Sequence, residues 1–584
     1  MNGAEYIVEF LRQRGSDKFF LLTGGACAFI IDAVGRNPGT TYTCFQHEQS
    51  AAMAVDSLYR IDGRLGVTVA TSGPGATNLI TGIASSYFDS IPAIHITGQV
   101  NKLESKGLEN CSARQLGFQE TNIVDMVKPV TKYAVQVNSA KELKEELSKA
   151  YNIAISGRKG PVLIDVPMNI QNEEMGEEIF YEVPEKLALN DNQNNEIAQK
   201  INDFLKDGER PLVVWGAGIG LSGSEQSIEN FLEENNLPFV SSWAGMTYFD
   251  NTSDNYIGHI GVYGNRGANF AIQNCDRLLV LGSRLDNRQR GGNPNNFAIT
   301  AETLAIDVDQ GELDKYRNKY ETICMDLSDF SSISSNIKIP KISADWLSYL
   351  KDLKNQYFNR DLSEFHKKEN SLSPYKIVQS LQSCIQEDAI VIGDTGAALC
   401  WMYQAFIRTK QLIFTSGGNS PMGYSLPASI GAAIHAPQRQ IISLNGDGGF
   451  QLNLQELQTI KQYDLDIKIF IFNNYGYGII KQFQDSYCES RYDATGKGYS
   501  CPDFKNIANA YDLEYHEIKS VDDMKQSIFD EKVATIIDVK LHPNTLIEPK
   551  LEMGRPIHDQ FPYLDDAEFE TNSRFCENTR KINS

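Results

Sequence analysis

The chain has 584 residues, 41% of them hydrophobic, and a formal net charge of −21. This length predicts three or four domains. Because no segment clusters Lys and Arg, the acidic balance argues against a nucleic-acid partner. No run of about 18 apolar residues and no basic, then apolar leader is visible, so we expect neither a membrane-spanning nor a secreted form. The ten cysteines form no CxxC pair, which predicts reduced thiols in the cytoplasm.

Short apolar runs alternate with amphipathic stretches through residues 4–171, as in a parallel α/β sheet. We therefore predict a first domain at residues 1–175. The polar stretch at residues 190–196 predicts a linker to a central domain, which we place at residues 190–335. That domain starts with an apolar run at 211–215, which leads directly into Gly216-Ala217-Gly218-Ile219-Gly220. Alone, such a GxGxG turn is a weak sign of dinucleotide binding.

The same alternation returns in a third domain, predicted at residues 365–543 after a charged helical connector at 343–371. Residues 544–584 form a C-terminal tail that we expect to wrap an outer surface. No strict internal repeat is visible. The predicted fold class is α/β, with three doubly wound parallel-sheet domains and a tail.

Two oxygen-bearing side chains follow two apolar runs of the third domain. Asp447, in Gly446-Asp447-Gly448, follows the first run, and Asn474 follows the second, 27 positions later. The carboxyl ends of two neighbouring strands can hold one cation between them, and Mg²⁺ prefers oxygen ligands with a phosphate in its shell. A lone GDG is more often a turn, but the pair at this spacing is a stronger signal. We predict Asp447, Asn474 and the Gly476 carbonyl as Mg²⁺ ligands.

Three motifs follow one another along the first domain. They are His47-Glu48-Gln49-Ser50-Ala51-Ala52, Thr71-Ser72-Gly73-Pro74-Gly75-Ala76-Thr77-Asn78 and Thr97-Gly98-Gln99. This series resembles the acetolactate synthase group of thiamine diphosphate (ThDP) enzymes, and the resemblance extends to about residue 560. It implies a pyrimidine-binding first domain, a diphosphate-binding third domain, and ThDP and Mg²⁺ as cofactors.

The resemblance assigns the catalytic role to Glu48. In that group the matching glutamate bonds N1′ of the aminopyrimidine and drives the imino tautomer, which removes the proton of thiazolium C2. A carboxylic acid held against a ring nitrogen is a general acid whose pKa a closed site can tune. Taken alone, a glutamate in a first helical turn is also explained by the helix dipole. Gly25 is expected near the reacting carbonyl, with Phe118, Gln119 and Gln99 lining the thiazolium.

In the third domain, residues 415–423 resemble the loop that holds ThDP bent, with Met422 between the two rings, although Met422 alone could be core filler. Residues 394–398 match the first diphosphate-contacting turn, with Ala397-Ala398 where many members carry Gln-His. The predicted cofactor-binding residues are Gly396, Ala397, Ala398, Ser420, Met422, Gly446, Asp447, Gly448, Gly449, Asn474, Gly476, Tyr477 and Gly478.

In the central domain, residues 261–264, 282–288 and 306–309 resemble the FAD-contacting series of acetolactate synthases. FAD is thus a candidate cofactor, with Arg284 near its diphosphate and Asp307 near its adenosine. Arg288 matches an arginine that grips the carboxylate of the acceptor. Each of these charged residues alone is also explained as a solvated loop end. Arg60 and Arg64 have no such context, and we place them on the surface.

Several positions depart from the acetolactate synthase pattern. Met168 replaces a lysine, Phe483 replaces a tryptophan that discriminates between acceptors, and residues 101–117 form a longer segment. These features resemble relatives from surface-polysaccharide and deoxysugar pathways, which transfer an acetyl unit to a nucleotide-linked keto-sugar. The acceptor therefore stays open between a keto acid and a keto-sugar.

The resemblance implies decarboxylation of a 2-oxo acid, with pyruvate as the expected substrate, followed by transfer to a second carbonyl. It also implies a homo-oligomer, at least a dimer, with active sites at the subunit interface. A simple decarboxylase of this superfamily would carry a His-His pair, and none of the eight histidines are adjacent. A catalytically inactive binding subunit is the alternative from another class, and absence of ThDP binding would favour it.

Overall fold

The structure is a computed structural model, and it describes residues 1–105, 113–183, 189–316, 318–358, 371–576 and 580. In the first domain, β3, Gly66–Ala70, and β6, Val162–Pro167, are buried along their whole length, as strands of a parallel sheet covered on both faces are. The other strands are β1 Lys18–Leu21, β2 Thr41–Cys44, β4 Ala93–Gln99 and β5 Tyr133–Gln136. The helices are α1 Gly3–Arg12, α2 Ala28–Arg36, α3 Glu48–Asp62, α4 Pro74–Asn78, α5 Ile80–Asp89, α6 Lys102–Ser105, α7 Ile123–Val127, α8 Ala140–Ile155 and α9 Met168–Gln171. The strand order is β2-β1-β3-β4-β6-β5.

The central domain has its own parallel six-stranded sheet. Its strands are β7 Pro211–Trp215, β8 Phe239–Ser241, β9 Tyr256–His259, β10 Arg277–Leu281, β11 Glu302–Asp307 and β12 Glu321–Cys324. Its helices are α10 Asp191–Leu205, α11 Ala217–Ser222, α12 Glu225–Glu234, α13 Arg266–Asn274, α14 Asn287–Arg290, α15 Gln310–Asp314, α16 Phe330–Ser334 and α17 Ala344–Leu353. The strand order is β12-β11-β10-β7-β8-β9.

The predicted linker at residues 190–196 is wrong, because these residues start α10. Asn190 and Gln193 form a capping box, in which each side chain accepts a hydrogen bond from the backbone N–H of the other residue. Such a box satisfies two backbone donors that a helix start would otherwise leave without partners. The polar composition of this stretch therefore marks a helix start.

The third domain repeats the architecture of the first. Its strands are β13 Ile390–Gly393, β14 Leu412–Phe414, β15 Ile441–Gly446, β16 Ile467–Asn473, β17 Glu514–Ile518 and β18 Thr535–Lys540. Its helices are α18 Pro374–Cys384, α19 Ala397–Ala405, α20 Ser425–His435, α21 Asp447–Phe450, α22 Leu457–Gln462, α23 Gly478–Tyr487, α24 Phe504–Ala510 and α25 Ser527–Asp530. The strand order is β14-β13-β15-β16-β18-β17. Three parallel sheets, one for each domain, confirm the predicted fold class.

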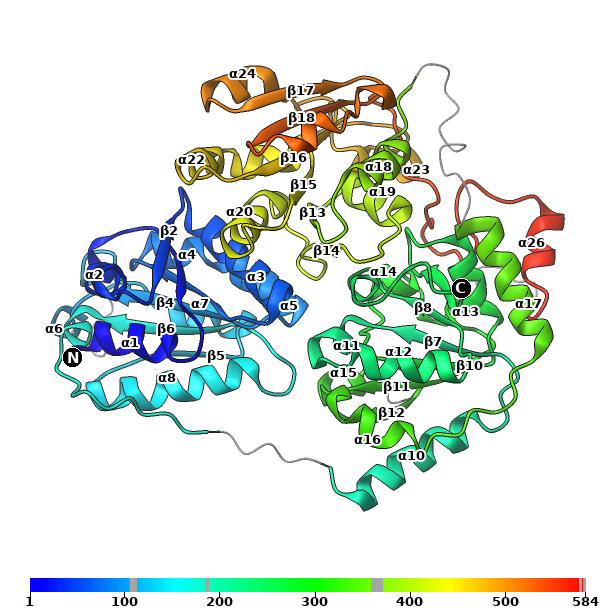
Figure 1. Cartoon of the computed structure of the whole chain (residues 1–584), viewed down its shortest axis with the longest axis horizontal. Helices are drawn as coiled ribbons and strands as arrows, with labels where there is room; N and C mark the ends of the chain where they lie inside the picture. The colour runs from blue at the N-terminus through cyan, green and yellow to red at the C-terminus, as the bar shows by residue number, and fades with distance from the viewer. Residues whose placement is uncertain (106–112, 184–188, 317, 359–370, 577–579, 581–584) are drawn as a thin grey trace.

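The three domains meet at the centre of the molecule (Figure 1). Helix α3 of the first domain packs on α20 of the third, and residues of both helices belong to one buried hydrophobic cluster that includes Met53, Ala54 and Leu426. A second buried cluster joins the central and third domains. The domains therefore share core contacts rather than being joined by linkers alone.

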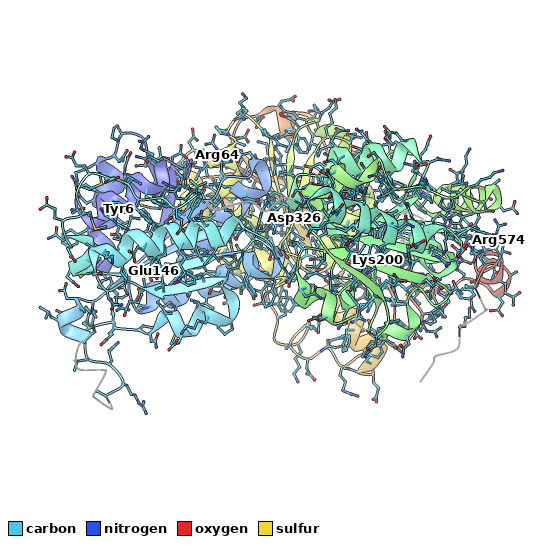
Figure 2. The ribbon with its side chains drawn as sticks, turned by 90° about the horizontal axis from the view of Figure 1, so that it is seen from below. Tyr6, Arg64, Glu146, Lys200, Asp326 and Arg574 are labelled. Atoms are coloured by element: carbon cyan, nitrogen blue, oxygen red, sulfur yellow. The ribbon has the colours of Figure 1, made fainter. Side chains whose placement is uncertain are left out.

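The C-terminal tail is not the outer wrapping that we expected. Ile557 is fully buried and Phe569, in α26 (Asp566–Asn572), is 1% exposed, both within the hydrophobic core of the central domain. Figure 1 shows the tail returning from the third domain to lie beside α13 and α17, and Figure 2 shows Arg574 at that edge of the molecule. Within the part of the chain that the structure describes, no helix has the length and apolarity needed to span a bilayer.

Candidate active site

Asp447 and Asn474 lie at the carboxyl ends of the neighbouring parallel strands β15 and β16. Both side chains are buried, with exposed fractions of 2% and 3%. Asp447 Oδ2 accepts a hydrogen bond from the Gly476 N–H at 2.9 Å, and Oδ1 accepts one from the Gly448 N–H at 3.0 Å. Burial raises the pKa of Asp447 to about 6. The structure thus brings the three predicted metal ligands together.

The surroundings of this carboxylate fit a diphosphate and a hard cation. Asn474 Nδ2 is buried and, within the described residues, has no hydrogen-bond partner, so it is ready to donate to an oxygen of a ligand. A Cβ on Gly478 would lie 2.5 Å from this nitrogen, whereas a Cβ on Gly446 would meet nothing within 4 Å. The described residues contain no group of three His, Cys, Asp or Glu suited to a metal. One carboxylate completed by phosphate and water oxygens is the usual Mg²⁺ arrangement.

Asp394 is a functional candidate that our sequence reasoning did not select. Its buried carboxylate follows β13 and accepts the backbone N–H groups of Gly423 at 3.1 Å and Tyr424 at 3.0 Å. A Cβ on Gly449 would lie 2.0 Å from Asp394 Oδ2, so this residue must be glycine. Burial raises the pKa of Asp394 to about 6. An aspartate immediately after a predicted strand was the signal that could have identified it.

The loop at residues 415–423 lies against this aspartate. Ser420 has a φ of 52°, and its hydroxyl lies 2.6 Å from Thr395 Oγ1. Gly396 caps α19, so Ala397 and Ala398 form the first turn of that helix, whose free N–H groups favour an anion. Met422 is partly exposed rather than fully buried.

In the first domain, Glu48 is the first residue of α3 and is 6% exposed. Its Oε2 accepts a hydrogen bond from Asn78 Nδ2 at 2.9 Å. A Cβ on Gly75 would come within 3.1 Å of Oε1, while one on Gly25 would meet nothing within 4 Å. Among the residues that the structure describes, Asn78 therefore fixes one carboxylate oxygen and leaves the other free. Our sequence reasoning quoted Asn78 within a motif without giving it this role.

The expected thiazolium-lining residues separate into two groups. Phe118 is 84% exposed in the single chain, and Gln119 has a φ of 61° and packs at Gly73. Gln99, by contrast, is directed into the domain, where its Nε2 donates to Asp165 Oδ2 at 3.0 Å and its Oε1 accepts the Val100 N–H. Its expected place at the thiazolium is therefore wrong. Of the longer segment at 101–117, residues 106–112 lie outside the described residues.

A cavity of about 1170 Å³ lies where the three domains meet. Arg284 and Asp307, the two residues expected near FAD, both line it, and so does Arg288. The GxGxG turn lies close against Gly282, because a Cβ on Gly216 would lie 2.1 Å from the Gly282 carbonyl oxygen. Thr395, Gly396 and Ser420 line the cavity from the third domain, and Phe88, Asp89 and Arg158 line it from the first.

Arg60 is not the surface residue that we expected. Its side chain is 8% exposed and contacts two carboxylates, with Nε 3.1 Å from Asp56 Oδ2 and Nη2 2.7 Å from Asp89 Oδ2. Arg64, just beyond the Gly63 cap that ends α3, is 50% exposed and lies at the outer surface (Figure 2). The Arg60 face of helix α3 is directed toward the third domain, and the packing of the two domains buries the arginine side chain despite its charge.

Comparison with known proteins matches each domain to the same family. The model described as "Thiamine pyrophosphate enzyme, N-terminal TPP binding domain" matches residues 1–126, the corresponding central domain matches 198–332, and the C-terminal TPP binding domain matches 394–539. The acetolactate synthase isozyme 2 large subunit of Escherichia coli (strain K12) is 31% identical over 532 residues, covering 90% of this chain and 93% of that protein. The chain belongs to the ThDP-dependent enzymes.

The probable acetolactate synthase large subunit of Methanocaldococcus jannaschii is 32% identical over 563 residues, covering 93% of this chain and 92% of that protein. The acetolactate synthase large subunit of Lactococcus lactis is 30% identical over 563 residues. This ThDP-dependent enzyme is therefore related to acetolactate synthase along nearly its whole length, and its first and third domains are ThDP-binding domains. The roles of individual residues, Mg²⁺, FAD and the reaction itself stay predictions.

Proposed function

We propose that this ThDP-dependent enzyme decarboxylates a 2-oxo acid, with pyruvate as the substrate, and joins the remaining two-carbon unit to a second carbonyl compound. The observation that carries the proposal is the presence, in one chain, of a fixed buried Glu48 and of Asp447 beside an unpartnered Asn474 amide. A binding subunit without activity has no use for a buried carboxylate held with one oxygen free. The full-length relatives named acetolactate synthase support this choice of reaction.

The third domain would hold the cofactor's diphosphate through Mg²⁺. Asp447 offers a carboxylate oxygen, Asn474 its amide oxygen and Gly476 its backbone carbonyl. Two N–H groups hold the Asp447 carboxylate in one orientation, so little reorganisation is needed on binding. The first turn of α19 adds backbone donors for phosphate oxygens.

The first domain would supply the proton-transfer group. ThDP, when bound, supplies the carbon nucleophile and the electron sink of the reaction. Glu48 holds a proton at the ring nitrogen of the aminopyrimidine through the oxygen that Asn78 leaves free. Gly75 keeps this oxygen accessible, since a side chain there would crowd it.

The proposal includes a homo-oligomer whose active sites lie between subunits. Large apolar side chains on both ThDP-binding domains are exposed in the single chain: Leu116, Phe118, Leu452 and Tyr475, at 50, 84, 50 and 45%. We infer that a second subunit covers these side chains in the proposed oligomer. The central cavity is proposed as the FAD site, with Arg284 and Asp307 at its diphosphate and adenosine.

The acceptor has two candidates. The carboxylate of a keto acid would pair with Arg288, whose guanidinium carbon lies 5.6 Å from the Tyr263 ring centre. A nucleotide-linked keto-sugar is the alternative, and Phe483 favours it. This side chain is 42% exposed and packs against Tyr487, with ring centres 4.8 Å apart.

The test is pyruvate consumption by the purified chain with ThDP and Mg²⁺, followed by analysis of the carbon products with and without keto-sugar nucleotides. Acetolactate from pyruvate alone establishes a keto-acid acceptor. Product that forms only after a keto-sugar nucleotide is added identifies a branched-sugar synthase. Release of acetaldehyde as the sole product contradicts the transfer step, and ThDP binding without any pyruvate consumption contradicts the whole proposal.

A further inference from the structure

We propose that Asp89 and Arg60 of the first domain are positioning residues for the loop at residues 415–423 of the third domain, and through it for the ring end of ThDP. The inference rests on the proposed function in one respect: this loop is taken to contact the cofactor rings. It assigns a role to a buried charge cluster that lies outside the catalytic and metal-binding residues.

The Asp89 carboxylate binds the backbone of the loop. It is the last residue of α5, and its Oδ2 and Oδ1 accept hydrogen bonds from the N–H groups of Gly417 at 2.9 Å and Gly418 at 2.7 Å. Two consecutive amides bound by one carboxylate fix both the position and the orientation of that peptide. The contact joins residues more than 300 positions apart in sequence.

Arg60 holds Asp89 in place. Its guanidinium bridges Asp89 and Asp56, and Asp56 in turn accepts the hydroxyl hydrogen of Tyr424, directly after the loop. The cluster therefore contacts the loop near its start, at Gly417, and just beyond its end. Removing one member of a buried charge cluster leaves the others uncompensated, so the unit acts as a whole.

Gly418 packs closely against the first domain on one side. A Cβ on Gly418 would lie 2.6 Å from Phe88 Cβ and 2.9 Å from Asp89 Oδ1. Two residues further on, Ser420 has a left-handed backbone and its hydroxyl lies against Thr395. Meanwhile Asp394 holds Gly423 from the opposite side. We therefore infer that a displacement at Gly418 is passed along the loop to Ser420 and Met422, the residues expected at the cofactor rings.

A positioning role and a purely structural role predict different binding data. Residues that hold the rings should matter for ThDP and not for its diphosphate half, which contacts Asp447 and Asn474 instead. We therefore compare the affinity for ThDP with that for inorganic pyrophosphate, each with Mg²⁺, by titration calorimetry on the full chain freed of cofactor. Neither measurement depends on turnover, so failure of the proposed reaction would leave this test intact.

The variants are Asp89→Asn and Arg60→Gln, with Arg64→Gln as the matched surface control. We expect the first two to weaken ThDP binding by about tenfold, the usual effect of losing a group that orients a ligand-binding residue, while pyrophosphate binding stays within about twofold. Arg64→Gln should change neither. Equal weakening of both ligands indicates only a structural role and overturns the proposal, as does unchanged ThDP binding.

Gly418→Ala serves as an independent variant if loss of a buried charge prevents folding. It leaves every charge in place and pushes the loop away from Phe88 and Asp89. The same selective loss of ThDP affinity is expected. Full ThDP affinity in a folded Gly418→Ala enzyme would show that the loop position does not matter and would overturn the proposal.

Discussion

The first and third domains share one strand order and differ in chemistry. Numbered within each sheet, both run second, first, third, fourth, sixth, fifth, whereas the central sheet runs sixth, fifth, fourth, first, second, third. Even the helices correspond, since α3 and α20 each follow the second strand and pack against each other. The shared fold therefore does not determine what each domain binds, and the residues after the strands do.

Two pairs of matching positions show how this works. After the third strand, the first domain has Thr71, whose hydroxyl accepts the Ala26 N–H, while the third domain has the carboxylate of Asp447. Within the sixth strand, both domains have an aspartate. Asp165 accepts from the neutral side chains of Thr97, Gln99 and Gln136, whereas Asp538 accepts from Lys540, Tyr515 and Asn473.

The largest effect is expected at the catalytic carboxylate of the first domain. Glu48→Gln keeps the shape and the hydrogen bond from Asn78 but removes the transferable proton. Turnover should fall about 1000-fold, within the usual range for general acid–base groups, while ThDP affinity stays within about threefold. Glu142→Gln, in the first turn of α8, is the matched control for a helix-dipole effect and should retain full turnover. Wild-type turnover by Glu48→Gln would defeat the assignment.

The second-largest effect is expected on metal affinity, because we propose a metal site after the third strand of the third domain and not at the matching position of the first. Asp447→Ala should weaken Mg²⁺ and ThDP together by at least about 100-fold, because losing a direct ligand costs more than losing a group behind one. Thr71→Ala, at the matching position of the first sheet, should leave both affinities unchanged. Calorimetric titration measures both. Full ThDP retention by Asp447→Ala would mean that the metal site lies elsewhere.

The packing of the two corresponding helices can be broken at a glycine. In Gly431→Ala, the new Cβ would lie 2.2 Å from the Ala54 carbonyl oxygen of α3, so the helices must separate. We expect a loss of up to about 3 kcal/mol in stability, as for other overpacked interiors, seen as a lower calorimetric midpoint. Gly35→Ala, in α2, meets only Tyr42 at 3.9 Å and should be neutral or slightly stabilising. Equal midpoints for the two variants would refute a tight α3–α20 contact.

The smallest effect is expected from Asp165, the sixth-strand aspartate of the first domain. Burial raises the pKa of Asp165 to about 6, above its ordinary 3.8. The folded state thus binds the proton more tightly, and this stabilisation is full below pH 4 and lost as the pH rises through 6. The loss amounts to about 2 kcal/mol between pH 4 and 6. Asp165→Asn should flatten that part of the stability profile, measured by denaturation at several pH values. An unchanged slope would assign the pH dependence to other groups.

The sequence predicted the site best where chemistry follows a strand directly. Asp447 and Asn474 were selected because the carboxyl ends of neighbouring parallel strands converge, and Glu48 was selected because the motifs around it resemble those of acetolactate synthases. Their roles stay predictions. Asp394 follows a strand as directly as Asp447 does, yet it was quoted, like Asn78, only within a motif, because the groups that contact each side chain are distant in sequence. For Asp394 these are Gly423 and Tyr424, about 30 positions away in sequence.

The domain plan was also predicted, since it depends on the order of apolar runs. The shared strand order of the first and third sheets could not be predicted from the sequence, because two sheets can have the same strand order while their side chains differ. Arg60 and the tail were misread for a related reason: an arginine and a run of mixed polar and aromatic residues suggest a surface, and only tertiary contacts reveal that they are buried. At residues 190–196, a capping box outweighed a polar composition that suggested a linker.

The path of the tail limits how the molecule can flex. The chain passes from the central to the third domain before α18, and it passes back when Leu551 N–H bonds the Val262 carbonyl oxygen and Phe575 N–H bonds Asn274. Between these points, Trp401 donates to the Leu546 carbonyl. Two domains that are connected at two places cannot separate by rotation about a single connection. Separating the two domains would therefore require the tail to leave the central domain, with loss of these backbone contacts.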